Sequence, residues 1–342
     1  MHQINPKTLV SEIKANLRAG LNTMIWGGPG IGKSDIPAQV AKELGIGILD
    51  FRANLFDPVD VRGIPHIVSL KESGKRFTKW AVPDVFPITQ RDGDRGLLFI
   101  DELPTAPPAT QNAFLQLLLT RQVGDYTLPD GWSILAAGNR LTDSAAVYQM
   151  PSPVRNRLAH YELEPTIEAW ADWAFANGID SSIISFLQYR PGLLNSFSAD
   201  EYAFPTPRSW SFVDKKLATY DKSTTKEDFF YGVAALVGDG PAGEFVAFKE
   251  IADDLPDVDK LIDDPSTYKL KADDNPAILY ALSGAIAARA EAPKLKNIMQ
   301  LVTKLPVEYQ VIAVKGCLAK DKTLLTNADL KDWINKNASV IL

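Results

Sequence analysis

A glycine-rich segment near the amino terminus constrains this chain more than any other feature. Residues 27–34 read Gly-Gly-Pro-Gly-Ile-Gly-Lys-Ser and fit the spacing G-x-x-x-x-G-K-[ST] of a phosphate-binding loop. The apolar run 21–26 predicts a strand before the loop, and residues 33–44 predict a helix after it. Glycines let backbone N–H groups curl around phosphate oxygens, and the helix N-terminus adds the positive end of its dipole. An ordinary glycine-rich turn would not need this context, so the sequence predicts a nucleotide site.

The residue types in the loop predict both cofactors, ATP and Mg²⁺. We expect Lys33 to reach the β- and γ-phosphates and the Ser34 hydroxyl to become a ligand of Mg²⁺. The residues predicted to contact the nucleotide are Gly28, Pro29, Gly30, Ile31, Gly32, Lys33 and Ser34.

Two acidic residues follow a second buried run. Residues 97–100 read Leu-Leu-Phe-Ile, which is typical of a central parallel strand, and Asp101 and Glu102 come next. Carboxylates at the carboxyl end of such a strand lie where open α/β sheets bind ligands. We expect Asp101 to hold Mg²⁺ through water and Glu102 to accept a proton from the attacking water. A solvated strand end is the alternative, and the phosphate loop upstream argues against it.

A third strand, predicted over residues 133–137, leads into Gly138 and Asn139. The uncharged amide of Asn139 could hold the attacking water or touch the γ-phosphate. A plain asparagine in a turn explains the same residue equally well, and both interpretations stay open on the residues alone.

Composition narrows the class of protein. The chain has 342 residues, a net charge of −6 and one cysteine, Cys317, so it has no internal disulfide and suits a reducing, cytoplasmic compartment. The net negative charge argues against a large nucleic-acid-binding surface, which would be expected to be basic. The apolar stretch 277–288 is too short to span a bilayer and predicts a buried helix, so we expect no membrane contact.

The rest of the chain divides into a part with predicted strands and hairpins and a part that is almost entirely helical. Residues 66–86 predict a hairpin around Ser73-Gly74, residues 123–132 a second hairpin, and residues 159–163 a strand. For Trp80 in the first hairpin, substrate contact and packing within its own hairpin are equally open. From residue 165 onward almost every pattern is helical, including 226–254, 276–290, 294–304 and 306–320.

The ordered set of phosphate loop, Leu-Leu-Phe-Ile-Asp-Glu, strand-end Asn139, Arg155 with Arg157, and Arg208 resembles the AAA+ ATPases. Within them the chain is most similar to the MoxR branch, in the segments 57–63 (Asp-Pro-Val-Asp-Val-Arg-Gly) and 101–108 and in the places of the two hairpins. The resemblance covers about residues 5–215.

This resemblance implies a fold and a set of roles. The fold is a three-layer αβα core with a parallel sheet over residues 1–165, a helical lid over 166–220 and a helical extension over 221–342. Asn139 matches sensor 1 and Arg208 matches sensor 2. Arg157 best matches the arginine finger that serves a neighbouring subunit, with Arg155 as the second candidate. The branch usually has Asp before the finger and Phe after it, whereas Asn156 and Leu158 flank Arg157, so the choice stays open.

Two functions follow from the resemblance. The first is a ring-forming, six-membered ATPase that remodels or activates a protein partner, such as a von Willebrand factor A-type protein. The alternative is a DNA-directed machine similar to helicase loaders or clamp loaders, which the acidic balance disfavours. A transporter-type ATPase is rejected, because Leu282-Ser283-Gly284 lies after the Asp-Glu strand, whereas that family's signature precedes it.

Overall fold

The computed structural model describes residues 3–69, 75–143, 147–198, 200–269 and 275–338. The chain divides into two compact units, Met1–Glu164 and Pro165–Leu342.

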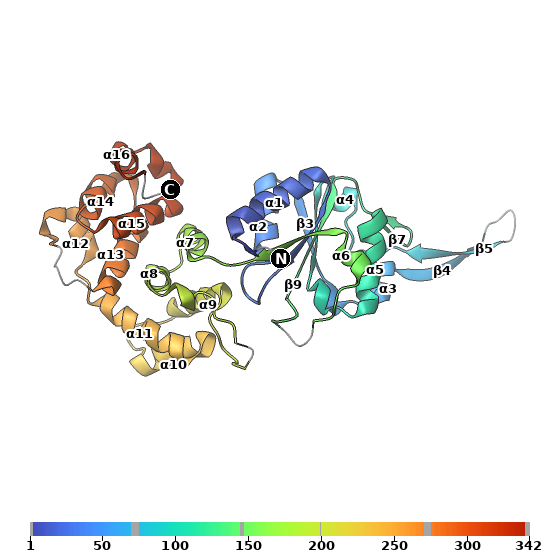
Figure 1. The fold of residues 1–342 in the computed structure, drawn as a ribbon, viewed down its shortest axis with the longest axis horizontal. Coiled ribbons are helices and arrows are strands. Elements are labelled where there is room, and N and C mark those ends of the chain that lie inside the picture. The colour runs from blue at the N-terminus through green and yellow to red at the C-terminus, as the bar shows by residue number, and fades with distance from the viewer. Residues whose placement is uncertain (1–2, 70–74, 144–146, 199, 270–274, 339–342) are drawn as a thin grey trace. The chain divides into compact units, whose positions relative to one another are not determined.

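A parallel sheet of six strands forms the centre of the first unit (Figure 1). The strands lie in the order β1-β10-β2-β9-β6-β3, and every neighbouring pair is parallel. Their bounds are β1 Gln3–Ile4, β2 Asn22–Trp26, β3 Gly47–Arg52, β6 Gly96–Asp101, β9 Trp132–Gly138 and β10 Leu158–Leu163. Strands β2, β6 and β9 were predicted from their apolar runs, because central parallel strands are buried on both faces. Strand β10 was predicted over residues 159–163. Strand β1 was not predicted, since two residues are too short to show a pattern.

Helices cover both faces of this sheet and make the first unit a three-layer αβα domain. Leu98 of β6 packs with Phe114 of α5 in one core. The next residue, Phe99, packs with Leu9 of α1 and Val40 of α2 in the other. The helices are α1 Pro6–Ala19, α2 Asp35–Leu44, α3 Pro58–Arg62, α4 Thr89–Asp92, α5 Pro108–Thr120 and α6 Ser152–Arg155, with 3₁₀ turns η1 Ala53–Leu55 and η2 Leu103–Thr105. The predicted fold class is confirmed.

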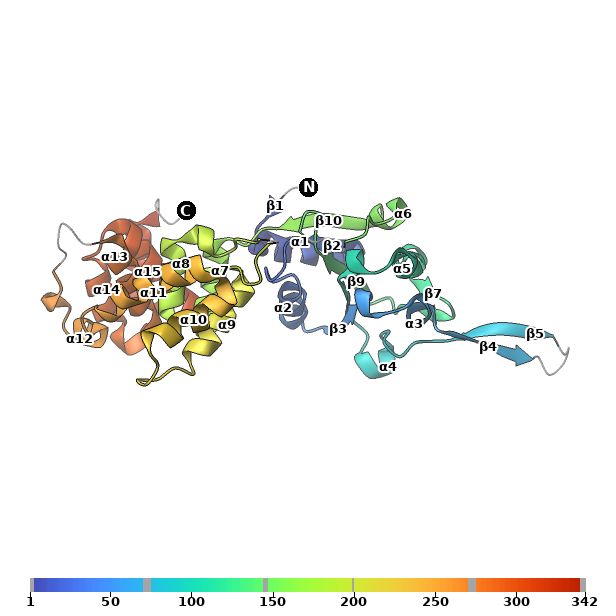
Figure 2. The ribbon, with the colours of Figure 1, turned by 90° about the horizontal axis from the view of Figure 1, so that it is seen from below.

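Two antiparallel hairpins extend this unit, as predicted. Strands β4 Ile64–Ser69 and β5 Arg76–Ala81 form the longer one, which projects from the sheet (Figures 1 and 2). Its predicted turn, Ser73-Gly74, lies outside the described residues. Strands β7 Gln122–Val123 and β8 Tyr126–Thr127 form the shorter one.

The base of the longer hairpin touches the turn of the shorter one. The backbone N–H of Trp80 donates to the Asp125 carboxylate at 2.9 Å. Gly124 adopts a φ of 56°, and a Cβ atom there would lie 3.1 Å from the Cβ of Trp80. Trp80 therefore packs against the turn of the second hairpin.

The second unit is all-helical, as predicted. Its helices are α7 Ile167–Ala176, α8 Ser181–Tyr189, α9 Pro207–Leu217, α10 Lys226–Val237, α11 Asp239–Asp253, α12 Val258–Asp263, α13 Pro276–Ala288, α14 Leu295–Val302, α15 Val307–Lys320 and α16 Ala328–Lys336, with 3₁₀ turns η3 Pro191–Leu193, η4 Pro265–Thr267, η5 Ala292–Lys294 and η6 Lys322–Thr326. One hydrophobic core runs from Trp170 to Trp333. The division into lid and extension at residue 220 stays a prediction, because this core includes residues from both sides of it.

Two helical segments of the second unit can be compared directly with the helices predicted from the sequence. The single pattern 226–254 is two helices, because Gly238, with a φ of 87°, interrupts helical bonding between them. Helix α13 is buried along most of its length, as expected for the apolar stretch 277–288. Among the residues that the structure describes, no helix is long and apolar enough to cross a bilayer.

Candidate functional site

The phosphate loop joins the carboxyl end of β2 to α2, with backbone conformations that favour glycine. Gly30 and Gly32 have φ values of 71° and 95°, which residues with a Cβ adopt only under strain. Helix α2 begins at Asp35 rather than at the predicted Lys33. The N–H groups of Asp35 and Ile36 both donate to the carbonyl oxygen of Gly32, at 3.1 Å each, so the regular helix starts only after this turn.

Lys33 is the buried cation of this loop. It is only 7% exposed, and its Nζ donates to the carbonyl oxygens of Gly27 at 2.8 Å and Gly28 at 2.6 Å. The third acceptor is the side-chain Oδ1 of Asn139, at 2.8 Å. A buried ammonium needs such partners, and the predicted sensor Asn139 is one of them. The fold therefore brings together two residues that are more than a hundred positions apart in the sequence.

Ser34 and Asp101 form a second contact at the same end of the sheet. Ser34 occupies the N-cap position of α2, but its hydroxyl does not cap the helix and donates instead to Asp101 Oδ2 at 2.9 Å. A serine at an N-cap normally bonds the first-turn N–H groups, so its diversion toward a carboxylate needs another explanation. The explanation we offer is that Ser34 Oγ and Asp101 Oδ2 form a pair of adjacent oxygen atoms of the kind that binds a hard metal ion.

These two oxygens fit the way in which proteins hold Mg²⁺. Mg²⁺ usually takes one or two protein ligands and completes its shell with phosphate and water oxygens. Across the described ranges, no group of three or more His, Cys, Asp or Glu side chains is placed to hold a metal alone. Ser34 and Asp101 therefore suit a metal whose remaining ligands are phosphate and water oxygens.

Glu102 is held in an unusual backbone conformation. Its φ of 55° and ψ of 30° lie in the left-handed region, which is uncommon for a residue other than glycine. Its N–H donates to Asp101 Oδ1 at 2.9 Å, and the Thr105 hydroxyl lies 3.2 Å from its carboxylate. Strain of this kind costs about 1–3 kcal/mol and persists where the surroundings enforce it, often at functional sites. The residue types around Glu102 did not predict it.

Arg155 and Arg157 lie near the amino ends of the parallel strands, opposite the carboxyl ends that carry the phosphate loop. Arg155 ends α6, and Arg157 immediately precedes β10, whose first residue, Leu158, pairs with Asn22 at the start of β2. The phosphate loop begins only after Trp26, four residues further along β2, which corresponds to about 13 Å. Both arginines are exposed, and the Arg157 guanidinium donates to the Pro153 carbonyl at 3.3 Å. The fold does not bring them to the Lys33 site of the same unit.

Arg208 belongs to the second unit. It is exposed at the second position of α9, where Thr206 caps the helix and Pro207 opens it. This matches the predicted place in the first helical turn. Its assignment as sensor 2 requires the two units to meet and stays a prediction.

An ion-pair cluster beside Asn139 was missed by the sequence analysis. Arg140 donates from Nε and Nη2 to the Asp143 carboxylate at 2.7 and 2.8 Å, and from Nη1 to Glu162 of β10. Because β2 lies between β9 and β10, this arginine reaches across the strand that carries the phosphate loop. The only available signal was that Arg140 follows Asn139 directly.

The charges of this cluster reinforce one another. The hydrogen bond to Asp143 raises the pKa of the Arg140 guanidinium, so it stays charged. Burial raises the pKa of the Asp143 carboxyl, but the hydrogen bonds from Arg140 outweigh burial and leave that pKa below its usual value.

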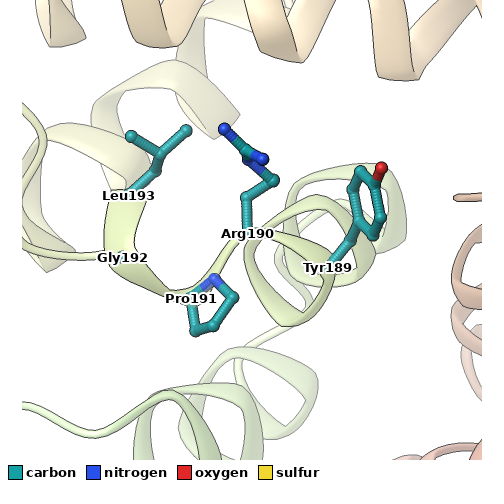
Figure 3. A pocket seen from close by; sticks show the side chains of 5 residues that line it. All are labelled: Tyr189, Arg190, Pro191, Gly192 and Leu193. Carbon is teal, nitrogen blue, oxygen red and sulfur yellow. The ribbon is translucent and has the colours of Figure 1, made fainter.

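The second unit contains a cavity of about 400 Å³ at the end of α8 (Figure 3). It is lined by Tyr189, Arg190, Pro191, Gly192 and Leu193. Arg190 is paired with Glu244 at 2.6 Å, and none of the predicted nucleotide residues lines the cavity.

The fold and these contacts define a phosphate-loop domain of the three-layer αβα class. No protein-family model and no curated protein matches the sequence. Among solved structures, the chain is similar to a mutant of RuvB from Thermotoga maritima, at 17% identity over 82% of this chain and 80% of that chain, with a TM-score of 0.41. It is also similar to NtrX from Brucella abortus in complex with ADP, at 13% identity over 98% and 68%, with a TM-score of 0.34.

Proposed function

We propose that this chain is a Mg²⁺-dependent ATPase that forms a ring and remodels or activates a protein partner. One observation carries the ATPase proposal: Lys33, Ser34, Asp101 and Asn139, from three separate parts of the sequence, meet at the carboxyl ends of neighbouring parallel strands. Ligands bind at this edge in open α/β sheets, and these residue types suit phosphate and Mg²⁺.

Each residue has a role in ATP hydrolysis. The Lys33 ammonium exchanges its carbonyl and amide partners for phosphate oxygens. Ser34 and Asp101 would hold Mg²⁺, which supplies positive charge against the phosphate oxygens. Glu102 accepts a proton from the water that attacks the γ-phosphorus while the bond to the bridging oxygen breaks, so that ADP and phosphate form. Asn139 orients the water or the γ-phosphate.

Hydrolysis with a matched control tests this proposal. Phosphate release should require Mg²⁺, should stop on chelation with EDTA, and should be lost in Lys33→Ala. Lys42→Ala removes an exposed lysine from α2, the helix that follows the loop, and should leave the rate unchanged. Hydrolysis by Lys33→Ala at the wild-type rate would overturn the assignment of the phosphate loop.

The place of the two arginines supports assembly into a ring. They lie at the sheet edge away from the phosphate loop of their own unit, so a guanidinium there can act only on the nucleotide of a neighbouring subunit. A contact of this head-to-tail kind closes into a ring or continues as a helix, and the AAA+ resemblance favours a ring of six. Arginine fingers contribute about 10³–10⁵-fold in rate.

Mixing experiments test the ring. Arg157→Ala and Lys33→Ala should each be inactive, and their mixture should regain activity where an intact arginine meets an intact loop. ATPase activity per subunit should also rise with protein concentration. If Arg155→Ala alone abolished hydrolysis, Arg155 would be the finger. A monomer with constant turnover and no regain on mixing would refute assembly through these arginines.

The partner is proposed to be a protein, in line with the MoxR-like segments 57–63 and 101–108. The projecting hairpin supports this, because it exposes Ile64, Ile67 and Phe77 (70%, 70% and 46% exposed). Apolar residues exposed together commonly mark contact surfaces.

Two experiments separate a protein partner from DNA. Addition of single- or double-stranded DNA should leave the ATPase rate unchanged, and stimulation would favour the DNA-directed alternative. Glu102→Gln loaded with ATP should retain the partner on an affinity column. The double variant Lys33→Ala/Glu102→Gln is the control, and selective recovery of a von Willebrand factor A-type protein would support the proposal.

A further inference from the structure

The imidazole of His160, in β10, links two segments on either side of it. Its Nδ1 lies 2.9 Å from the indole Nε1 of Trp26, and its Nε2 lies 2.8 Å from the carbonyl oxygen of Arg155. The indole N–H can only donate and the carbonyl can only accept. The ring is therefore the neutral tautomer that carries its hydrogen on Nε2. The rings of Trp26 and His160 also stack, with centroids 6.0 Å apart.

Trp26 belongs to the phosphate-loop end of the sheet. It is the last residue of β2 and pairs with Gly138 on one side and Glu162 on the other. The next residue, Gly27, accepts a hydrogen bond from Lys33 Nζ at 2.8 Å. The indole is thus attached to the strand that delivers the phosphate loop.

Arg155 belongs to the arginine-bearing segment. Arg155 is the last residue of the four-residue helix α6. The carbonyl oxygens in the last turn of a helix receive no hydrogen bond from an N–H group of the same helix. His160 supplies the donor for this carbonyl and so holds the backbone at Arg155, two residues before Arg157. The bond acts on the backbone and involves neither guanidinium group.

We infer that His160 is a positioning residue that sets the arginine-bearing segment against the phosphate-loop strand. The inference rests on the proposed action of these arginines on a neighbouring subunit. It has one specific consequence: loss of the His160 contacts impairs hydrolysis in the neighbour that receives the arginine, not in the subunit that carries the change.

Mixed rings test this asymmetry. Acceptor subunits carry Arg155→Ala/Arg157→Ala, so they can hydrolyse ATP but offer no arginine. Donor subunits carry Lys33→Ala, so they offer arginines but do not hydrolyse. Adding His160→Phe to the donors should lower the regained activity about three- to tenfold, the size expected for one lost hydrogen bond. Adding it to the acceptors should leave that activity unchanged.

Further variants separate positioning from folding. Trp26→Phe removes the donor to Nδ1 while keeping an aromatic ring at this position, and it should act like His160→Phe when placed in donors. His160→Gln, whose amide can still donate to the Arg155 carbonyl, should restore part of the activity. Acceptors with His160→Phe should bind a fluorescent ATP analogue normally. Equal losses in donors and acceptors, or no loss in either, would overturn the inference. No regained activity in the reference mixture would instead refute the arginines' action on neighbours, and the inference with it.

Discussion

Replacing Arg140 with alanine should destabilise the first unit by about 2 kcal/mol. The side chains of Asp143 and Glu162 are only 5% and 14% exposed, so both carboxylates would lose their buried partner. Removing one member of a buried pair costs about 3–5 kcal/mol, whereas exposed pairs contribute about 0–1 kcal/mol. Arg140 itself is 34% exposed, which places the expected loss between these limits.

The loss should depend on pH in a defined direction. The pKa of Asp143 lies below its ordinary value of 3.8 in the folded chain, because hydrogen bonds from Arg140 outweigh its burial. A depressed folded pKa stabilises the fold above the unfolded pKa, and this contribution disappears as the pH falls through the folded pKa. The difference between wild type and Arg140→Ala should therefore be constant near neutral pH and shrink as the pH falls below 3.8.

Urea unfolding followed by circular dichroism measures the difference, with linear extrapolation to water. Arg18→Ala removes an exposed arginine from α1 and serves as the control. A double-mutant cycle with Asp143→Ala isolates the pair, and its coupling should account for most of the loss. If Arg140→Ala unfolds at the same urea concentration as Arg18→Ala, or if the difference grows in acid, the ion-pair argument is refuted.

Three further predictions concern the phosphate loop, the base and the hairpins. Lys33→Ala should lose nucleotide affinity in equilibrium titration with a fluorescent ATP analogue, because a charge-assisted contact to the phosphates disappears; unchanged affinity would contradict the loop assignment. Glu102→Gln should bind ATP normally and hydrolyse it about 10²–10⁴-fold more slowly, and a wild-type rate in phosphate release would show that another group is the base. Trp80→Ala should lower the melting temperature, since Trp80 packs against Gly124. Normal melting with lost partner stimulation would show instead that Trp80 contacts the substrate.

Local features of the sequence were sufficient for much of the fold. The spacing between Gly27 and Ser34 predicted the loop, because only a few residue types allow a backbone to wrap phosphate. Apolar runs predicted the central strands, since burial on both faces removes the polar alternation. The carboxyl ends of parallel strands share one edge, so Asp101 and Asn139 could be expected near Lys33 before any distance was known.

Contacts between distant residues were decided only by the tertiary structure. The hydrogen bond between Trp26 and His160 joins residues 134 positions apart, and no sequence pattern marks either partner. The reach of Arg140 across β2 to Glu162 depends on the strand order β9-β2-β10, which the chain order does not contain. The strained conformation of Glu102 likewise follows from the packing around it. Periodicity and spacing report what each segment prefers, whereas strand order and side-chain partners follow from how the segments pack together.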